Sequence, residues 1–165
     1  MVTLSLETQG KEQADELIAK LKEKGAGFKL ASSKTLVDNV GISDVAQGYD
    51  GNLYFADYGG GWSVNKNGSV QVIRPKDKEL KRAGKAVAQL MTDGFSHRSL
   101  PELSALLEHA DQRIRQAAQF AMVEKGELAV AKLNEILGDK EFSLLAKLHS
   151  IWGLGQLARN GYSES

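Results

Sequence analysis

Four aspartates follow predicted strands or turns and could bind a metal ion. Calcium prefers several oxygen donors from closely spaced loops, and the carboxylates of Asp38, Asp44, Asp50 and Asp57 lie in one short stretch. Their spacing does not match an EF-hand loop, and aspartate is also common at turns and strand ends. We therefore interpret Asp50 as a turn residue and predict no metal site.

Two aromatic residues flank a run of glycines and could bind an organic ligand. Tyr58 and Trp62 could stack on a sugar or a quinone, or could instead pack on the sheet as a lid. The glycines at 59–61 lack the helix, lysine and serine of a phosphate-binding P-loop. No cofactor is predicted, and the candidate ligand-binding residues are Asp44, Asp57, Tyr58 and Trp62.

The remaining reactive side chains form no catalytic motif. His97, His109 and His149 are far apart in the sequence and do not form an H-E-x-x-H zinc motif. No serine lies in a nucleophile elbow, and no pair of carboxylates is framed by an acid/base motif. The sequence predicts no catalytic residue and favours a non-enzymatic role, with His149 lining a helix interface.

Composition narrows the possible partners. Lysine plus arginine (21) equals aspartate plus glutamate (21), so we expect no broad basic face and no nucleic-acid partner. Cysteine is absent, which removes disulfides, thiolate chemistry and thioether-linked haem. The first 25 residues contain neither a signal-peptide core nor a membrane-spanning run, so no membrane insertion is predicted and the compartment stays open.

The elements that would position these side chains change character along the chain. Residues 1–9 alternate apolar and polar side chains, which predicts a half-buried strand. Residues 11–24 place Ala14, Leu17, Ile18 and Leu21 at helical spacing, which predicts an amphipathic helix.

The next segment, 27–74, is typical of an antiparallel meander. Asp50-Gly51-Asn52 and Asn67-Gly68 are hairpin signals, because these residue pairs accept the positive φ angles of tight turns. The strands that we predict are 28–31, 35–40, 53–57 and 69–73. Residues 1–75 are therefore predicted to be a β-sheet domain with the helix 11–24 inserted.

Residues 76–165 are predicted to be an all-α domain. Ser99, Pro101 and Glu102 have the spacing of an N-cap, a first-turn proline and a capping acid, and Gly94 is a stop signal. The predicted helices are 80–90, one that begins after Ser99, 112–124, 127–137 and 144–159.

These helices carry a weak repeat of about thirty residues. Leu133, Ile136 and Leu137 correspond to Leu103, Leu106 and Leu107, and Phe120 corresponds to Trp152. Helix pairs that cannot bury their apolar faces alone are expected to stack on one another.

The stretch Asp111-Gln112-Arg113-Ile114-Arg115-Gln116-Ala117-Ala118 resembles the start of the second helix of HEAT repeats. The resemblance implies that Asp111 caps this helix, that Arg115 lies near an aspartate, and that Trp152 is a structural residue of the repeat.

A second resemblance involves the β-rich segment. Residues 41–57, from Gly41-Ile42-Ser43-Asp44-Val45 to Leu53-Tyr54-Phe55-Ala56-Asp57, resemble a blade of NHL-like and sugar-dehydrogenase-like β-propellers. The run 27–159 looks like the propeller-to-HEAT junction of bacterial membrane-bound dehydrogenase-like proteins, described as sorbosone or glucose dehydrogenases with a haem-binding segment. That family implies an exported or periplasmic origin. Without cysteine, and with material for about one blade, a single copy holds neither a complete propeller nor a covalently attached haem.

Taken together, the sequence predicts an α+β protein in which a single blade-like sheet precedes a HEAT-like helical stack. The leading hypothesis for function is a non-catalytic interaction or assembly module that binds a protein partner or itself. The alternative is one part of a split sugar or aldehyde dehydrogenase that is active only with a companion chain.

Overall fold

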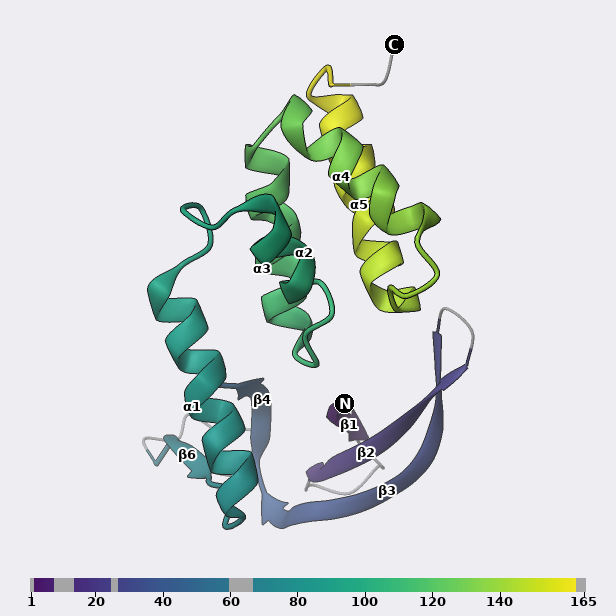
Figure 1. Ribbon diagram of the computed structural model, residues 1–165. Coiled ribbons are helices and arrows are strands. Elements are labelled where there is room, and N and C mark those ends of the chain that lie inside the picture. The colour runs from purple at the N-terminus through teal and green to yellow at the C-terminus, as the bar shows by residue number, and fades with distance from the viewer. Residues whose placement is uncertain (1, 8–13, 25–26, 60–66, 163–165) are drawn as a thin grey trace. The chain divides into compact units, whose positions relative to one another are not determined.

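The computed structural model describes residues 2–7, 14–24, 27–59 and 67–162, and it has mixed α+β architecture (Figure 1). The described chain forms two antiparallel three-stranded sheets and five helices. It divides into two compact units, residues 1–88 and 89–165, which are described separately. The proposed domain boundary between residues 75 and 76 separates strands from helices and stays a prediction.

The first sheet has the strand order β1-β2-β3 and is antiparallel throughout. Its strands are β1 (Val2–Glu7), β2 (Ala14–Lys24) and the long β3 (Gly27–Val40). The strand predicted at the N-terminus is thus confirmed by β1. The two short strands predicted within residues 28–40 are joined in the single strand β3.

The amphipathic helix predicted over residues 11–24 is wrong, since Ala14–Lys24 is the central strand of this sheet and residues 11–13 lie outside the described chain. The backbone of β2 pairs with β1 on one side, where Leu4 is opposite Ile18, and with β3 on the other. Pairing on both sides satisfies the backbone groups that a helix would satisfy internally. Helical spacing of a few apolar residues is a weak preference that such pairing overrides.

The second sheet has the order β4-β5-β6 and is also an antiparallel meander. Strands β5 (Leu53–Asp57) and β6 (Ser69–Ile73) occupy the predicted positions, whereas β4 (Ile42–Gln47) was not predicted as a strand. Ile42 and Phe55 are the buried apolar residues of this sheet. The predicted meander is therefore correct for residues 42–73 only. The prediction of a single blade-like sheet over residues 1–75 is wrong, because residues 27–40 pair with β2 and belong to the first sheet.

The turn between β4 and β5 is built around Asp50. Gly51 has φ of 80°, a conformation that favours glycine, and the Gly48 N–H donates to the Asn52 carbonyl oxygen at 2.9 Å. The Asp50 carboxylate accepts hydrogen bonds from the Asn52 N–H (3.1 Å) and the Tyr54 hydroxyl (2.8 Å). These bonds favour the ionised carboxylate and lower the pKa of Asp50. Asp50 is thus the turn residue that was predicted.

Helix α1 (Lys78–Asp93) is preceded by a capping aspartate and followed by a glycine. Asp77 Oδ1 accepts hydrogen bonds from the N–H groups of Glu79 and Leu80 at 2.8 and 2.9 Å. Gly94, with φ of 77°, follows the last turn and confirms the predicted stop.

The β4–β5 turn contacts α1 at Gly84, and this contact leaves no space for a side chain. A Cβ atom on Gly84 would lie 2.5 Å from the Asp50 carbonyl oxygen and 3.0 Å from Gly51 Cα. Both neighbours are backbone atoms, which cannot rotate away. Glycine at this helix position therefore permits the close approach of the turn.

The Gly84→Ala variant tests this contact. Alanine in a helix interior normally stabilises by about 1 kcal/mol relative to glycine, but here the clash is expected to destabilise by about 1–3 kcal/mol. Hydrogen exchange of the α1 amides is the measurement. Gly138→Ala is the matched control, because a Cβ there would meet nothing within 4 Å. Slower exchange in Gly84→Ala than in the wild type would contradict the prediction.

The second unit contains four helices in the predicted order. They are α2 (Leu100–Leu106), α3 (Gln112–Glu124), α4 (Glu127–Gly138) and α5 (Leu144–Arg159). The capping box of α2 is present, because the Ser99 N–H donates to Glu102 Oε2 at 2.8 Å and the Glu102 N–H donates to Ser99 Oγ. No helix in the described ranges is long and apolar enough to span a membrane.

The four helices pack in two layers. Helix α2 contacts α3 and α4, and helix α5 contacts α3 and α4 (Figure 1). The largest fully buried apolar side chains of this unit are Leu103, Leu107, Ile114, Met122, Leu133, Ile136 and Leu157.

Contacts at both ends of the unit show that α3 and α5 run in parallel. The N–H of Ser143, the N-cap of α5, donates to the Glu108 carboxylate just before α3 at 2.8 Å. At the opposite end, the Tyr162 ring lies within 3.2 Å of the position that a Cβ of Gly126 would take. The parallel pair α3–α5 thus presents one continuous face.

Candidate functional site

A groove of about 410 Å³ lies between the parallel helices α3 and α5. Every residue that lines it belongs to the second unit. The lining residues are Gln112, Gln116, Gln119 and Phe120 of α3, and His149, Ile151, Trp152, Gly155, Gln156 and Arg159 of α5.

Large apolar side chains stand at the surface of this groove. Phe120 is 44% exposed, and Ile151 and Trp152 are each 52% exposed. Trp152 therefore keeps half of its surface in water, although it also makes an edge contact with the His149 ring at 5.0 Å between centroids. A cluster of large apolar side chains beside a hollow is typical of recognition surfaces.

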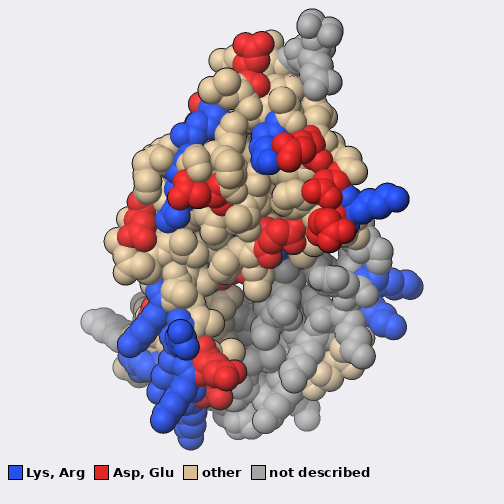
Figure 2. Space-filling model, viewed as in Figure 1, with Lys and Arg blue, Asp and Glu red and all other residues tan. Residues whose placement is uncertain are grey.

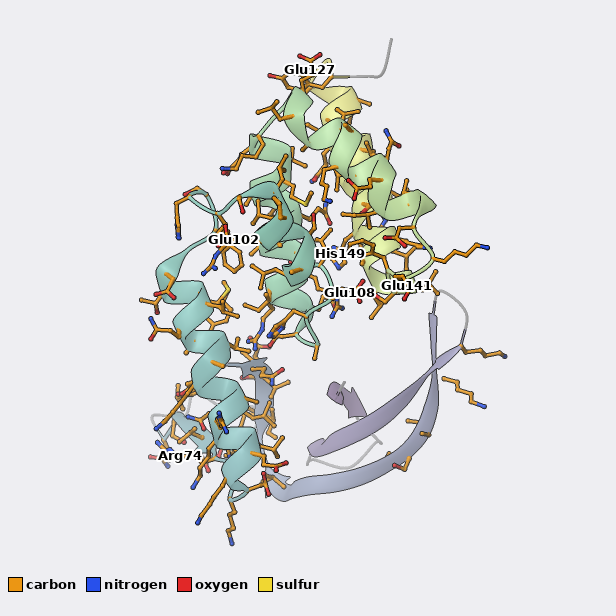
Figure 3. All side chains as sticks on the ribbon, viewed as in Figure 1. Arg74, Glu102, Glu108, Glu127, Glu141 and His149 are labelled. Carbon is orange, nitrogen blue, oxygen red and sulfur yellow. The ribbon has the colours of Figure 1, made fainter. Side chains whose placement is uncertain are left out.

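A buried polar network forms the floor of the groove. His149 Nδ1 lies 2.7 Å from Gln119 Oε1, and the Gln119 side-chain amide donates to Gln156 Oε1 at 2.9 Å. Gln119 and His149 are only 4% and 3% exposed. The network connects α3 to α5, so it holds the two walls of the groove at a defined separation. Figure 3 shows His149 on the side of α5 that faces α3.

His149 is uncharged at neutral pH. Burial lowers its pKa to about 4, and the nearby positive charge of Arg115 acts in the same direction. With this arrangement of the amide groups, the neutral imidazole carries its proton on Nδ1 and donates to Gln119. The prediction that His149 lines a helix interface is consistent with this position.

Two glycines of α5 determine the shape of the groove. A Cβ on Gly153 would lie 3.1 Å from Leu133 Cδ1, so Gly153 allows α4 to pack closely on α5. Gly155 lines the groove, and a Cβ there would meet only the Arg159 guanidinium, at 3.8 Å. The absence of a side chain at Gly155 keeps the groove hollow.

The residues of the HEAT-like stretch fix the start of α3. Asp111 Oδ1 accepts from the Arg113 N–H at 2.8 Å, so its predicted capping role is confirmed, and Arg113 also forms an ion pair with it at 2.6 Å. Burial raises the pKa of Asp111, but the hydrogen bonds from Arg113 outweigh burial and hold that pKa below its usual value. Arg115 donates to the carbonyl oxygens of His109 and Ala110.

The ligand candidates from the sequence all belong to the first unit, and its two candidate aspartates accept hydrogen bonds from neighbouring residues. Asp44 Oδ1 accepts from the Val45 N–H at 2.8 Å, and Asp57 accepts from the Gly59 N–H at 2.9 Å and from the Gln71 side chain at 3.1 Å. Tyr58 is exposed, and Trp62 lies outside the described residues. Within the described ranges, no three acidic or histidine side chains come together as a metal site.

Helix α1 carries a basic surface that sequence composition did not predict. Lys78, Lys81, Arg82 and Lys85 recur at i, i+3, i+4 and i+7, and all four are exposed. The buried residue Val87 lies on a different face. Figure 2 shows lysine and arginine side chains gathered where α1 lies. The overall charge balance therefore conceals a local separation of charge, and the absence of a nucleic-acid partner stays a prediction.

The chain matches no protein-family model, no curated protein and no solved structure. The resemblances to HEAT repeats and to propeller dehydrogenases therefore stay predictions. The α3–α5 groove is the feature of the described residues that a function can be inferred from.

Proposed function

We propose that this protein is a non-catalytic interaction module that binds a protein partner in the α3–α5 groove. The observation that carries the proposal is the pair of half-exposed aromatic side chains, Phe120 and Trp152, on either side of a hollow with a buried polar floor. Exposed aromatic anchors beside a pre-formed hollow are the features that most often supply binding energy in protein interfaces.

The rigidity of the groove supports this proposal. Its walls are linked by the Gln119 network and its two ends are held by contacts at Ser143 and Gly126. A groove that is already formed before binding loses little conformational entropy when a partner enters. The two-layer packing of α2–α5 is in keeping with a HEAT-like stack, and that fold assignment is part of the proposal.

Photocrosslinking in the native host tests the proposal. A photoreactive benzoyl-phenylalanine in place of Gln116 stands at the groove margin and leaves Phe120 and Trp152 intact. We expect it to form a covalent adduct with a polypeptide. The same amino acid in place of Leu128, which is exposed on α4, is expected to form none.

A matched pair of glycine variants shows whether the adduct depends on the groove. Gly155→Leu adds a side chain at a groove position where a Cβ would meet no backbone atom, and Gly138→Leu adds the same side chain at a position outside the groove lining where a Cβ would meet nothing within 4 Å. We expect the adduct to be lost in the first variant and kept in the second. An adduct of equal yield in both, or no adduct at position 116, would overturn the proposal.

A further inference from the structure

The side chains that line the groove carry positive charge and no negative charge. Among the ten lining residues the only charged side chain is Arg159, and none is acidic. Its guanidinium lies 3.8 Å from the position that a Cβ of Gly155 would take, so it reaches back along α5 to the part of the groove at Gly155. Arg115 lies close enough below for its charge to act on His149. The groove therefore favours a negatively charged occupant.

The amide side chains of α3 have a spacing that suits an extended chain. Gln112 and Gln116 are four residues apart on one face of the helix and both are exposed along the groove. Four residues of helix rise about 6 Å, and two residues of extended chain span about 6.6–6.8 Å. Each glutamine amide can donate to a carbonyl and accept from an N–H, so successive glutamines can pair with alternate residues of a bound strand.

The apolar part of the groove supplies a place for one side chain. Phe120 from α3 and Ile151 and Trp152 from α5 leave apolar surface exposed beside the hollow at Gly155. A leucine or similar side chain of the occupant would bury this surface. Water would then be excluded from the ring of Trp152, which strengthens the neighbouring polar contacts.

We infer that the groove binds an extended, acidic peptide segment of a partner protein, with an apolar side chain between Phe120 and Trp152 and a carboxylate at Arg159. This inference rests on the proposed function, because it names the chemical class of partner for the same groove. Gln112 and Gln116 form hydrogen bonds with the peptide backbone. Phe120 and Trp152 contact the apolar side chain, and Arg159 forms an ion pair with the carboxylate.

Fluorescence anisotropy with labelled synthetic peptides and the full chain tests the inference. The probe is a short peptide of serine, leucine and aspartate, and the comparison peptides replace aspartate by asparagine or by lysine. We expect the acidic peptide to bind at least about tenfold more tightly than the asparagine peptide, and the lysine peptide to bind least. Equal affinity for all three, or preference for the lysine peptide, would overturn the inference, as would no binding of the acidic peptide.

Variants assign the binding to this groove. Trp152→Ala and Gly155→Leu are each expected to weaken binding of the acidic peptide at least about tenfold, and Gly138→Leu is expected to leave it unchanged. Arg159→Glu is expected to reverse the preference in favour of the lysine peptide. An acidic preference that survives Arg159→Glu would contradict the assigned role of Arg159.

The two proposals fail in different ways. A crosslink at position 116 that the acidic peptide does not compete would preserve the interaction module and overturn the acidic occupant. Loss of the crosslink in the presence of excess acidic peptide, but not of the lysine peptide, would support both. The outcome therefore separates the existence of a partner from its chemistry.

Discussion

Leu133→Ala is expected to lower the free energy of unfolding of the helical unit by about 2–5 kcal/mol. Leu133 is completely buried on α4, and its Cδ1 atom fills the space above Gly153 of α5. Removal of the isobutyl group deletes apolar contacts and leaves a cavity that two packed helices cannot close fully. Chemical denaturation followed by helical circular dichroism is the measurement.

Leu128→Ala is the control for this substitution. Leu128 is on the same helix but is 74% exposed, so its truncation is expected to change stability by less than about 0.5 kcal/mol. Equal losses in the two variants would contradict the assignment of Leu133 to the core.

A double-mutant cycle with Gly153→Ala tests the same contact from the other side. A Cβ on Gly153 would lie 3.1 Å from Leu133 Cδ1, which is closer than ordinary van der Waals contact. The added methyl group is expected to cost stability in the wild type and much less in the Leu133→Ala background. The expected coupling between the two substitutions is about 0.5–3 kcal/mol. Strict additivity would show that the contact is not close.

Helix positions in the second unit could be predicted because their signals are local. Ser99 and Glu102 form a capping box, Asp111 caps α3, and Gly94 ends α1 at a positive φ angle. Each of these signals depends on residues within one turn of the helix end. Helices α3 and α5 therefore begin and end at the residues predicted from the sequence.

The strand β2 could not be predicted in this way. Leu17 and Leu21 fit a helical period of four residues, and Leu17, Ala19 and Leu21 also fit a strand period of two. The choice between the two depends on pairing with the preceding strand β1 and the following strand β3, whose partner residues lie up to 26 positions away, as in the pair of Ala14 and Val40. Non-local pairing is not visible in a single short window.

The candidate groove was missed for a related reason. Phe120 and Trp152 were noticed as corresponding positions of a repeat, and Trp152 was given a structural role in the repeat, which stays a prediction. Their exposure depends on how α3 and α5 pack side by side. The available signal was the glutamine spacing of α3, since Gln112, Gln116 and Gln119 share a face that carries no charge.

Acidification is expected to destabilise the helical unit through His149. The folded protein holds the pKa of His149 at about 4, whereas the unfolded chain has the ordinary value of 6.5. The unfolded chain therefore takes up a proton as the pH falls below about 6.5, while the folded chain does so only near pH 4. Titration of His149 leaves the free energy of unfolding unchanged above pH 6.5. It lowers that free energy progressively between pH 6.5 and 4, and lowers it no further below pH 4.

The expected size of this effect follows from the shift. Between pH 7 and pH 5 the linkage amounts to about 2 kcal/mol, because one pKa unit corresponds to about 1.4 kcal/mol. Protonation would place a charge beside Arg115 in a site that is 3% exposed to water. It would also leave Gln119 between a cationic imidazole and the Gln156 amide, at the floor of the groove.

His149→Gln separates this contribution from that of the carboxylates. The glutamine amide can still donate to Gln119 Oε1 but does not titrate, and all other ionisable groups are shared with the wild type. Denaturation at pH 7 and pH 5 is expected to show a loss of stability that is about 2 kcal/mol smaller in the variant. An NMR titration of the wild type provides the direct check. A folded-state midpoint near 6.5 for His149 would mean that the imidazole is hydrated, and that the polar floor of the groove is open to water instead of buried.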